Sequence, residues 1–148
     1  MVITQQLLFN RKKEEPMSDK HNPINQESKE KNRYSDEELQ EFEALLTDKL
    51  DASRKELEYL QDQMRRLADD PDNRMGSLEN GVGTLEKEYL NKMASRQSQY
   101  IRHLENALIR VKNKVYGICR ETGKLISKDR LRAVPHATLS IEAKKARR

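Results

Sequence analysis

Apolar residues recur at steps of three and four over residues 39–67, and this spacing limits the possible folds more than any other feature. Such a repeat places one apolar stripe along a single face of an α-helix, close to the 3.5-residue period of a coiled coil. A helix of about 33 residues would extend roughly 50 Å at 1.5 Å per residue. The predicted stripe consists of Leu39, Phe42, Leu46, Leu50, Ser53, Leu57, Tyr59 or Leu60, Met64 and Leu67.

Both ends of this helix are marked in the sequence. Ser35 and Glu38 stand three residues apart, which predicts a capping box in which each side chain accepts the other residue's backbone N–H. The helix is predicted to stop in the segment ADDPDNRMG, because Pro71 lacks an N–H and disfavours helical geometry at Asp70. The Asp and Asn side chains of the same segment favour turns, so the chain is expected to reverse there.

A second apolar stripe of similar length follows this turn. Two long stripes joined by a short connection predict an antiparallel helical hairpin over residues 34–116, with an acidic tip near residues 69–76. A dimeric or longer coiled coil is the structural alternative, and Pro71 together with the glycines that follow it favours the hairpin. The predicted second stripe consists of Leu85, Tyr89, Met93, Arg96, Tyr100, His103 or Leu104, Ala107 or Leu108, Val111 and Val115.

Composition favours an elongated helical protein over a large globular core. Of the 148 residues, 34% are hydrophobic and 36% are charged, with two Phe and no Trp. Residues 1–33 are polar after Phe9 and cannot bury enough surface to offset the entropy of ordering, so they are predicted to form a disordered tail. Met17, which begins the polar stretch MSDKHNPINQ, is an alternative start. Residues 117–148 lose the helical period, which predicts a small C-terminal module that ends in a short helix.

The sequence also argues against a membrane protein, a secreted protein and an enzyme. No segment approaches the roughly 18 apolar residues of a membrane span, and the first apolar run precedes the basic residues, the reverse of a secretory signal. A cytoplasmic protein is therefore expected. Cys119 is the single cysteine, which excludes an intramolecular disulfide, and it has no recognisable base to make it a nucleophile. Three scattered histidines and one cysteine do not assemble a catalytic set, so an enzyme is not expected.

These features occur in the same order as in a known family. A capped helix, an Asp-rich tip, a returning helix and then YGIC, TGKLIS and RLRAVPHATLSIEAK resemble the DksA/TraR family of bacterial transcription regulators, over about residues 35–146. The match is most specific from Tyr116 to Lys144. Family members combine a long coiled coil with a four-cysteine zinc finger. The resemblance thus agrees with an all-α dominated fold, in which a long antiparallel hairpin is followed by a small zinc-finger-like module.

The resemblance implies four metal positions, and this chain departs from the family there. Where the family has cysteines, this sequence has Cys119, Thr122, Ser140 and Ala143 at the same spacing. One thiol, two hydroxyls and a methyl group are a poor donor set for tetrahedral zinc, so the site is expected to be degenerate and no cofactor is expected. His136 is the one local residue that could substitute as a ligand. The module is predicted to be held by Ile118, Leu125, Ile126, Leu131, Val134, Leu139 and Ile141.

The resemblance also implies a function that needs no covalent chemistry. In the family, the hairpin enters the secondary channel of RNA polymerase, the acidic tip approaches the active-site region, and the module contacts the outer rim. This makes a non-enzymatic RNA polymerase-binding regulator the expected function. The family tip has two aspartates three residues apart, and in the register that matches best Asn73 stands in place of the second, so the tip is expected to keep negative charge but to lose the contact made by that carboxylate. One register earlier, Asp69 and Asp72 also stand three apart, but Pro71 then no longer follows the first aspartate. The predicted polymerase-contacting tip consists of Asp69, Asp70, Asp72, Asn73 and Arg74.

Two other functions remain open, a direct DNA-binding regulator that uses the basic end KKARR and a structural coiled-coil adaptor. Direct DNA binding is not expected, because the sequence lacks a base-reading recognition helix and a dimer signature. A monomer is expected for the same reason. Some members of the family bind a guanosine tetraphosphate alarmone together with polymerase, and no ligand residues are assigned for it. Positive charge near the corresponding place comes from Lys124, Lys128, Arg130 and Arg132.

Overall fold

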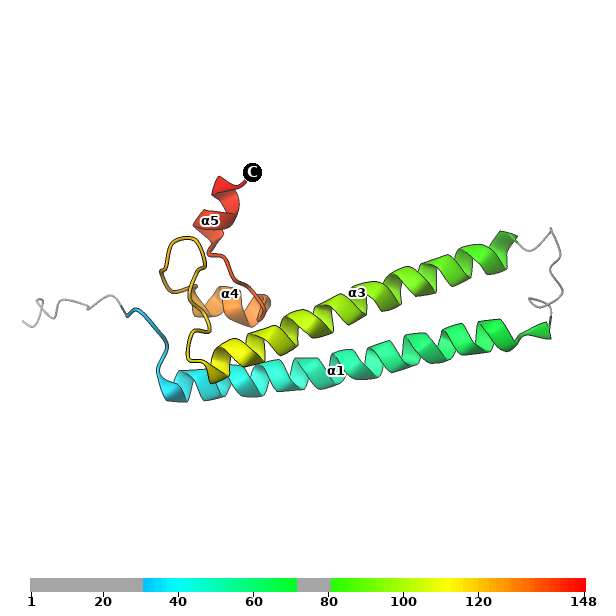
Figure 1. Ribbon diagram of the computed structural model, residues 1–148, viewed down its shortest axis with the longest axis horizontal. Helices are drawn as coiled ribbons and strands as arrows, with labels where there is room; N and C mark the ends of the chain where they lie inside the picture. Colours follow the sequence, from blue (N-terminus) through cyan, green and yellow to red (C-terminus); the bar gives the residue numbers. More distant parts are fainter. Residues whose placement is uncertain (1–30, 72–80) are drawn as a thin grey trace, which may run out of the picture. The chain divides into compact units, whose positions relative to one another are not determined.

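The computed structural model describes residues 31–71 and 81–148 (Figure 1). The segment Lys31–Arg148 forms one compact unit. Most of the predicted tail, residues 1–30, lies outside the described residues. The second part of the predicted tip lies outside them too, namely Asp72, Asn73 and Arg74.

Helix α1 spans Asp36–Asp69 and begins with the predicted capping box. The backbone N–H of Glu38 donates to the Ser35 hydroxyl at 3.3 Å, and the backbone N–H of Ser35 donates to the Glu38 carboxylate at 2.9 Å. The C-cap, Asp70, has φ −65° and ψ 121°, the extended backbone that a following proline imposes. Pro71 therefore ends the helix where the sequence predicts.

Helix α3 spans Gly81–Lys112 and runs antiparallel to α1, which confirms the predicted hairpin and the all-α dominated fold (Figure 1). Within the described residues, no helix is both long and apolar enough to cross a membrane. Where the sequence left two candidates, the structure buries Leu60 rather than Tyr59, and Leu104 rather than His103. The buried residues of the hairpin are Leu39, Phe42, Leu46, Leu50, Ser53 and Leu60 on α1, and Ile101, Leu104, Ala107 and Val111 on α3.

The predicted second stripe is wrong at Leu85, Tyr89, Arg96 and Val115, which are exposed; Leu85 and Tyr89 are 66% and 61% exposed. Met93 of the same stripe is half-buried, as are Leu90 and Gln97, and Gln97 contacts the Ser53 carbonyl of α1. A helix is a rigid rod with 3.6 residues per turn, so the phase of one well-packed section fixes the phase of the rest. Here the fully buried Leu104 and its neighbours determine which face of α3 meets α1.

A polar contact between α1 and α3 separates two halves of the hairpin that differ in how tightly they are packed. The side-chain amide of Gln97 on α3 donates to the Ser53 carbonyl on α1 at 3.1 Å. We call residues 36–53 with 97–112 the basal half, and residues 54–69 with 81–96 the distal half. Among the described residues of the distal half, Leu60 is the one that is buried. The two ribbons also lie further apart there than in the basal half (Figure 1).

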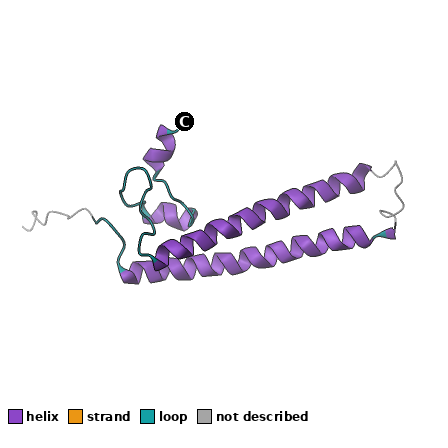
Figure 2. Ribbon diagram, in the orientation of Figure 1, coloured by secondary structure: helices purple, strands orange, loops and turns teal. Residues whose placement is uncertain are grey.

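Residues 113–148 form the small module at the basal end, with short helices connected by loops (Figure 2). Helix α4 spans Lys128–Ala133, and the predicted last helix is α5, Ile141–Ala146. One isolated antiparallel bridge, Ile118 to Leu125, is the β-type pairing found in the described part of the chain. Of the predicted packing residues, Ile126 and Leu131 are buried and four others are partly covered, whereas Ile141 is 44% exposed.

Aromatic residues join the module to the hairpin. The ring of Phe42 on α1 packs between those of Tyr34 and Tyr116, with centroid distances of 5.4 and 5.3 Å. The Tyr34 hydroxyl donates to the Ile126 carbonyl, and the Tyr116 hydroxyl donates to the Pro135 carbonyl at 2.7 Å. Burial raises the pKa of Tyr116 well above its ordinary value, so this hydroxyl stays protonated as a donor. The module is thus attached to the first turns of α1 by both packing and directed hydrogen bonds.

Candidate functional site

The end of α1 is the part of the predicted tip that the structure describes. Asp69 is the last residue of the helix and Asp70 is its C-cap, and both are exposed. The negative end of the helix dipole disfavours carboxylates, so this placement is not what helix stability alone would select. The C-terminal end of α1, which these two residues form, lies at the distal end of the hairpin, and the module lies at the other end (Figure 1).

A carboxylate at the basal end joins three segments. Glu38 on α1 forms ion pairs with Lys31 at 2.7 Å and with Lys128 of α4 at 2.8 Å, besides its capping bond with Ser35. Hydrogen bonds from Lys128 first, then from Lys31 and the Ser35 N–H, lower the pKa of the Glu38 carboxyl well below its ordinary value. This carboxylate therefore remains charged and holds the module against the start of α1.

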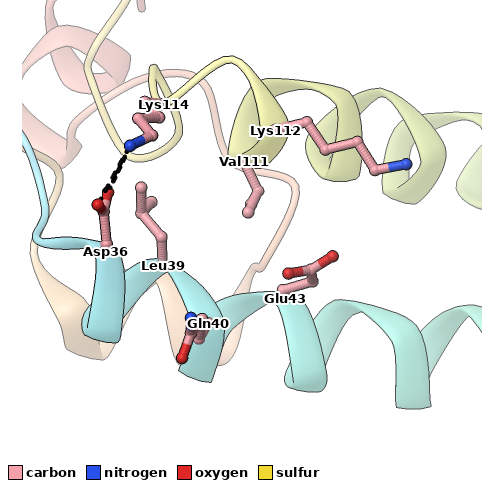
Figure 3. Close-up of a pocket in the computed structure, with 7 residues that line it drawn as sticks. All are labelled: Asp36, Leu39, Gln40, Glu43, Val111, Lys112 and Lys114. Atoms are coloured by element: carbon pink, nitrogen blue, oxygen red, sulfur yellow. Dashed lines mark hydrogen bonds and ion pairs between the residues drawn. The ribbon is translucent and has the colours of Figure 1, made fainter.

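A second ion pair, also at the basal end, joins the start of α1 to the segment that follows α3 (Figure 3). Lys114 Nζ lies 3.0 and 3.1 Å from the two carboxylate oxygens of Asp36. The pair borders a groove of about 270 Å³. Glu43 and Lys112 add one charge of each sign to its lining, so the groove favours no single class of ligand. Its lining residues are Asp36, Leu39, Gln40, Glu43, Val111, Lys112 and Lys114.

The four predicted metal positions lie together in the module. Cys119 is 1% exposed, and its Sγ accepts the Ser140 backbone N–H at 3.3 Å. The Ser140 hydroxyl caps α5 by accepting the Ala143 N–H at 3.2 Å. Burial raises the pKa of the Cys119 thiol, but hydrogen bonds from the Thr122 hydroxyl and from the N–H groups of Ser140, Thr122 and Glu121 outweigh this and lower it to about 6. The Thr122 hydroxyl and the neighbouring backbone N–H groups therefore favour a thiolate at Cys119.

Most of the basic residues considered for an alarmone already have partners. Lys128 pairs with Glu38, and Arg130 Nε donates to the Leu139 carbonyl at 2.9 Å. Arg132 lies 3.7 Å from Asp129. Lys124 is exposed, and its backbone N–H donates to the Thr122 hydroxyl. The structure therefore does not gather these four side chains into one cluster of available positive charge.

A cluster of aromatic and histidine rings, which the sequence did not predict, lies at the junction of α3 and the module. The His136 ring stacks on His103 with a centroid distance of 5.5 Å and meets Tyr100 edge-on at 5.3 Å. Arg110 donates to the His136 carbonyl at 3.3 Å. Burial, and then the nearby His103 and Arg110, lower the pKa of His136 and favour its neutral form. The sequence could not predict this cluster, because His136 is far in sequence from Tyr100 and His103. The one hint was that His103 and Leu104 were alternatives for the same position of the predicted second stripe.

Comparisons with known proteins agree with this architecture. Residues 114–147 match the family model described as the prokaryotic dksA/traR C4-type zinc finger. General stress protein 16O of Bacillus subtilis (strain 168) is 29% identical over 96 residues, which cover 64% of this chain and 56% of that protein. The RNA polymerase-binding transcription factor DksA of Caulobacter vibrioides is 48% identical over 48 residues, 32% of this chain and 34% of that protein. The matches thus span little more than half of one curated relative and about a third of the other.

A solved structure matches a larger part of the chain. Transcription factor DksA2 from Pseudomonas aeruginosa superimposes with a TM-score of 0.68 at 25% sequence identity. The match covers 74% of this chain and 81% of that chain. This structural match must include part of the hairpin as well as the module, because the module match, residues 114–147, makes up far less than 74% of the chain. None of these relatives is named as an enzyme.

The family match corrects the prediction that the chain has no cofactor. The matching domain is a C4-type zinc finger, which points to zinc binding, and Cys119 keeps a thiolate-favouring environment of the kind a metal ligand needs. The other three positions do not fit a four-cysteine site, since Ser140 is used as a helix cap and Ala143 has no donor atom. Across the described residues, no group of three or more His, Cys, Asp or Glu could hold a metal ion.

The zinc-finger match, the Caulobacter relative and the DksA2 structure all point to the same family, and the fold contains a long hairpin followed by a small module. Together these matches support membership of this chain in the DksA/TraR family.

Proposed function

We propose that this protein is a non-enzymatic transcription factor that binds RNA polymerase and inserts its hairpin into the secondary channel. The single observation that best supports the proposal is the α1–α3 hairpin itself, which has Asp69 and Asp70 at one end and the module fastened to the other. A protein that acts by reaching into a channel needs a stiff rod, a charged tip and a handle. The Caulobacter relative is named as RNA polymerase-binding, which supports this choice of partner.

The residues proposed to act at the tip are Asp69, Asp70, Asp72, Asn73 and Arg74. Their charge would act on the polymerase active-site region electrostatically, so no nucleophile or base is needed. Binding occurs in the cytoplasm and involves one copy of this chain. The proposal does not require direct DNA binding or an alarmone. Of the basic residues considered for an alarmone, Lys128, Arg130 and Arg132 already have partners within the chain.

The first test is binding of the purified full chain to bacterial RNA polymerase at low salt, measured by comigration in size-exclusion chromatography and by a fluorescence titration. A complex that competes with a known secondary-channel protein is the expected result. No complex at low salt would refute the proposal.

The second test separates tip action from binding. The double variant Asp70→Ala, Asp72→Ala is expected to bind polymerase as the wild type does but to lose its effect on the lifetime of promoter complexes. Asn73→Asp, which restores the family's second carboxylate, is expected to strengthen that effect. If all three proteins affect promoter complexes equally, the tip is not the acting element and a structural adaptor becomes the better description.

A further inference from the structure

The distal half of the hairpin contains a groove that the proposed function does not explain. Its volume is about 500 Å³, and it opens between the last turns of α1 and the first turns of α3. We call it the distal groove. Its lining residues are Gln61, Met64, Arg65, Ala68 and Lys87.

The groove exists because the two helices do not close on each other in the distal half. Met64 on α1 lies on the predicted apolar stripe, but α3 presents Lys87 to it. The described apolar residues of that part of α3 do not line the groove: Leu85 and Tyr89 are mostly exposed, and Leu90 and Met93 are half-buried outside its lining. A long, charged side chain cannot fill an apolar seam without desolvation, so the seam stays open.

The chemistry of the groove is amphipathic with positive flanks. Met64 supplies a half-buried, polarizable apolar floor. Arg65 and Lys87 stand at its sides, and Arg65 pairs with Asp62 while Lys87 has no ion pair with any described residue. Because two cations flank an apolar floor, the complementary occupant has an acidic side chain next to an apolar one.

We propose that the distal groove binds a segment of RNA polymerase in which an acidic side chain stands beside an apolar one. The inference rests on the proposed function, which places the distal half of the hairpin inside the polymerase channel. The apolar side chain would cover Met64, and the carboxylate would pair with Lys87 and with the guanidinium edge of Arg65 that Asp62 leaves open. This contact fixes how far the hairpin extends into the polymerase channel, independently of any contact made by the acidic tip.

The first test reverses the charge at the groove. Lys87→Glu is expected to weaken binding of the full chain to purified RNA polymerase on the order of tenfold at low salt, and by less at high salt. Lys92→Glu is the matched control, since Lys92 is exposed on the same helix but does not line the groove, and its binding is expected to remain close to wild type. Lys87→Arg is expected to bind nearly as the wild type does.

The outcomes separate the inference from the function on which it rests. If the wild type does not bind polymerase, the proposed function fails, and the inference fails with it. If the wild type binds and the Glu variants at positions 87 and 92 bind equally well, the function stands and the groove contact is refuted. Circular dichroism of each variant verifies that the helix content is unchanged before binding is compared.

The second test identifies the occupant. Gln61→benzoylphenylalanine places a photocrosslinker in the groove, and Tyr59→benzoylphenylalanine places one on α1 outside it at a site that is 57% exposed. Irradiation of the complex with polymerase is expected to join position 61 to a polymerase peptide that contains Asp or Glu next to an apolar residue, whereas position 59 gives a different product or none. A crosslink from position 61 to residues 72–80 of the same chain, to a second copy of it, or to a polymerase peptide without an acid would overturn the proposal.

Discussion

The basal and distal halves of the hairpin are built from the same two helices but are packed very differently. In the basal half, large side chains such as Leu46 and Leu104 are fully buried, and the module covers the end. In the distal half, Leu60 is the buried residue among those described, while Tyr59, Leu85 and Tyr89 are more than half exposed. The basal half therefore contains most of the buried core, whereas the distal half leaves large apolar side chains exposed.

Core truncation is the strongest way to break this comparison. Leu104→Ala in the basal half is expected to lower the free energy of unfolding by about 2–5 kcal/mol, because it leaves a cavity in a fully buried site. The matched change Leu90→Ala in the distal half is expected to cost about 1 kcal/mol or less, since Leu90 is only half-buried. Urea unfolding followed by circular dichroism measures both values. Equal losses would show that the two halves are packed alike.

The attachment of the module can be tested at a glycine. Gly117 has φ +77°, and a Cβ atom there would collide with the Tyr34 ring, so Gly117→Ala is expected to cost about 3 kcal/mol. Gly123 is the control: its φ is +67°, but a Cβ atom would meet open space. Gly123→Ala is therefore expected to cost only the backbone strain, about 1–2 kcal/mol. Thermal unfolding of the two variants compares them directly, and an equal loss would mean that Tyr34 moves aside without cost.

Acid titration probes the ion pair that holds the module. The folded-state pKa of Glu38 is below its ordinary value of 4.5, so its charge stabilises the fold above about pH 4.5, and this contribution is lost as the pH falls toward the folded-state pKa. Glu38→Gln is expected to be less stable than the wild type at neutral pH, with a smaller effect than that of Gly117→Ala. The difference should shrink as the pH is lowered below 4.5. If the difference in stability between the wild type and Glu38→Gln stays constant with pH, the lost stability comes from altered side-chain packing and not from the lost charge.

The smallest effect is expected on the exposed face of the distal half. Leu85→Gln should change the free energy of unfolding by no more than about 0.5 kcal/mol, because Leu85 is 66% exposed and Gln is also a good helix former. The same change at Leu46, which is fully buried, is expected to prevent stable folding. Comparison of the two by urea unfolding sharpens the contrast between the halves. A large loss from Leu85→Gln would mean that this face packs against α1 in solution.

Local signals explain which structural predictions succeeded. The capping box at Ser35 and Glu38 and the stop before Pro71 involve residues within one or two turns of each other, so neighbouring chemistry decides them. The stripe on α1 was also correct, because Leu39, Phe42, Leu46 and Leu50 leave only one apolar face. The grouping of the four metal positions followed from the family spacing and not from the residues alone. The absence of a cofactor was inferred from side-chain types, and the match to a C4-type zinc finger contradicts it.

The sequence by itself determined the two long helices, the end of the first helix before Pro71 and the loss of helical period at the small module, since each depends on short-range periodicity, caps and breakers. Only the tertiary structure decided the phase of α3, the ion pairs of Glu38 and the rings stacked on His136. On α3, apolar residues occur on more than one face, so the pattern in the sequence permits several orientations. Packing of Ile101, Leu104 and Val111 against α1 selects one of them, and the rigidity of the helix then turns Leu85 and Tyr89 outward.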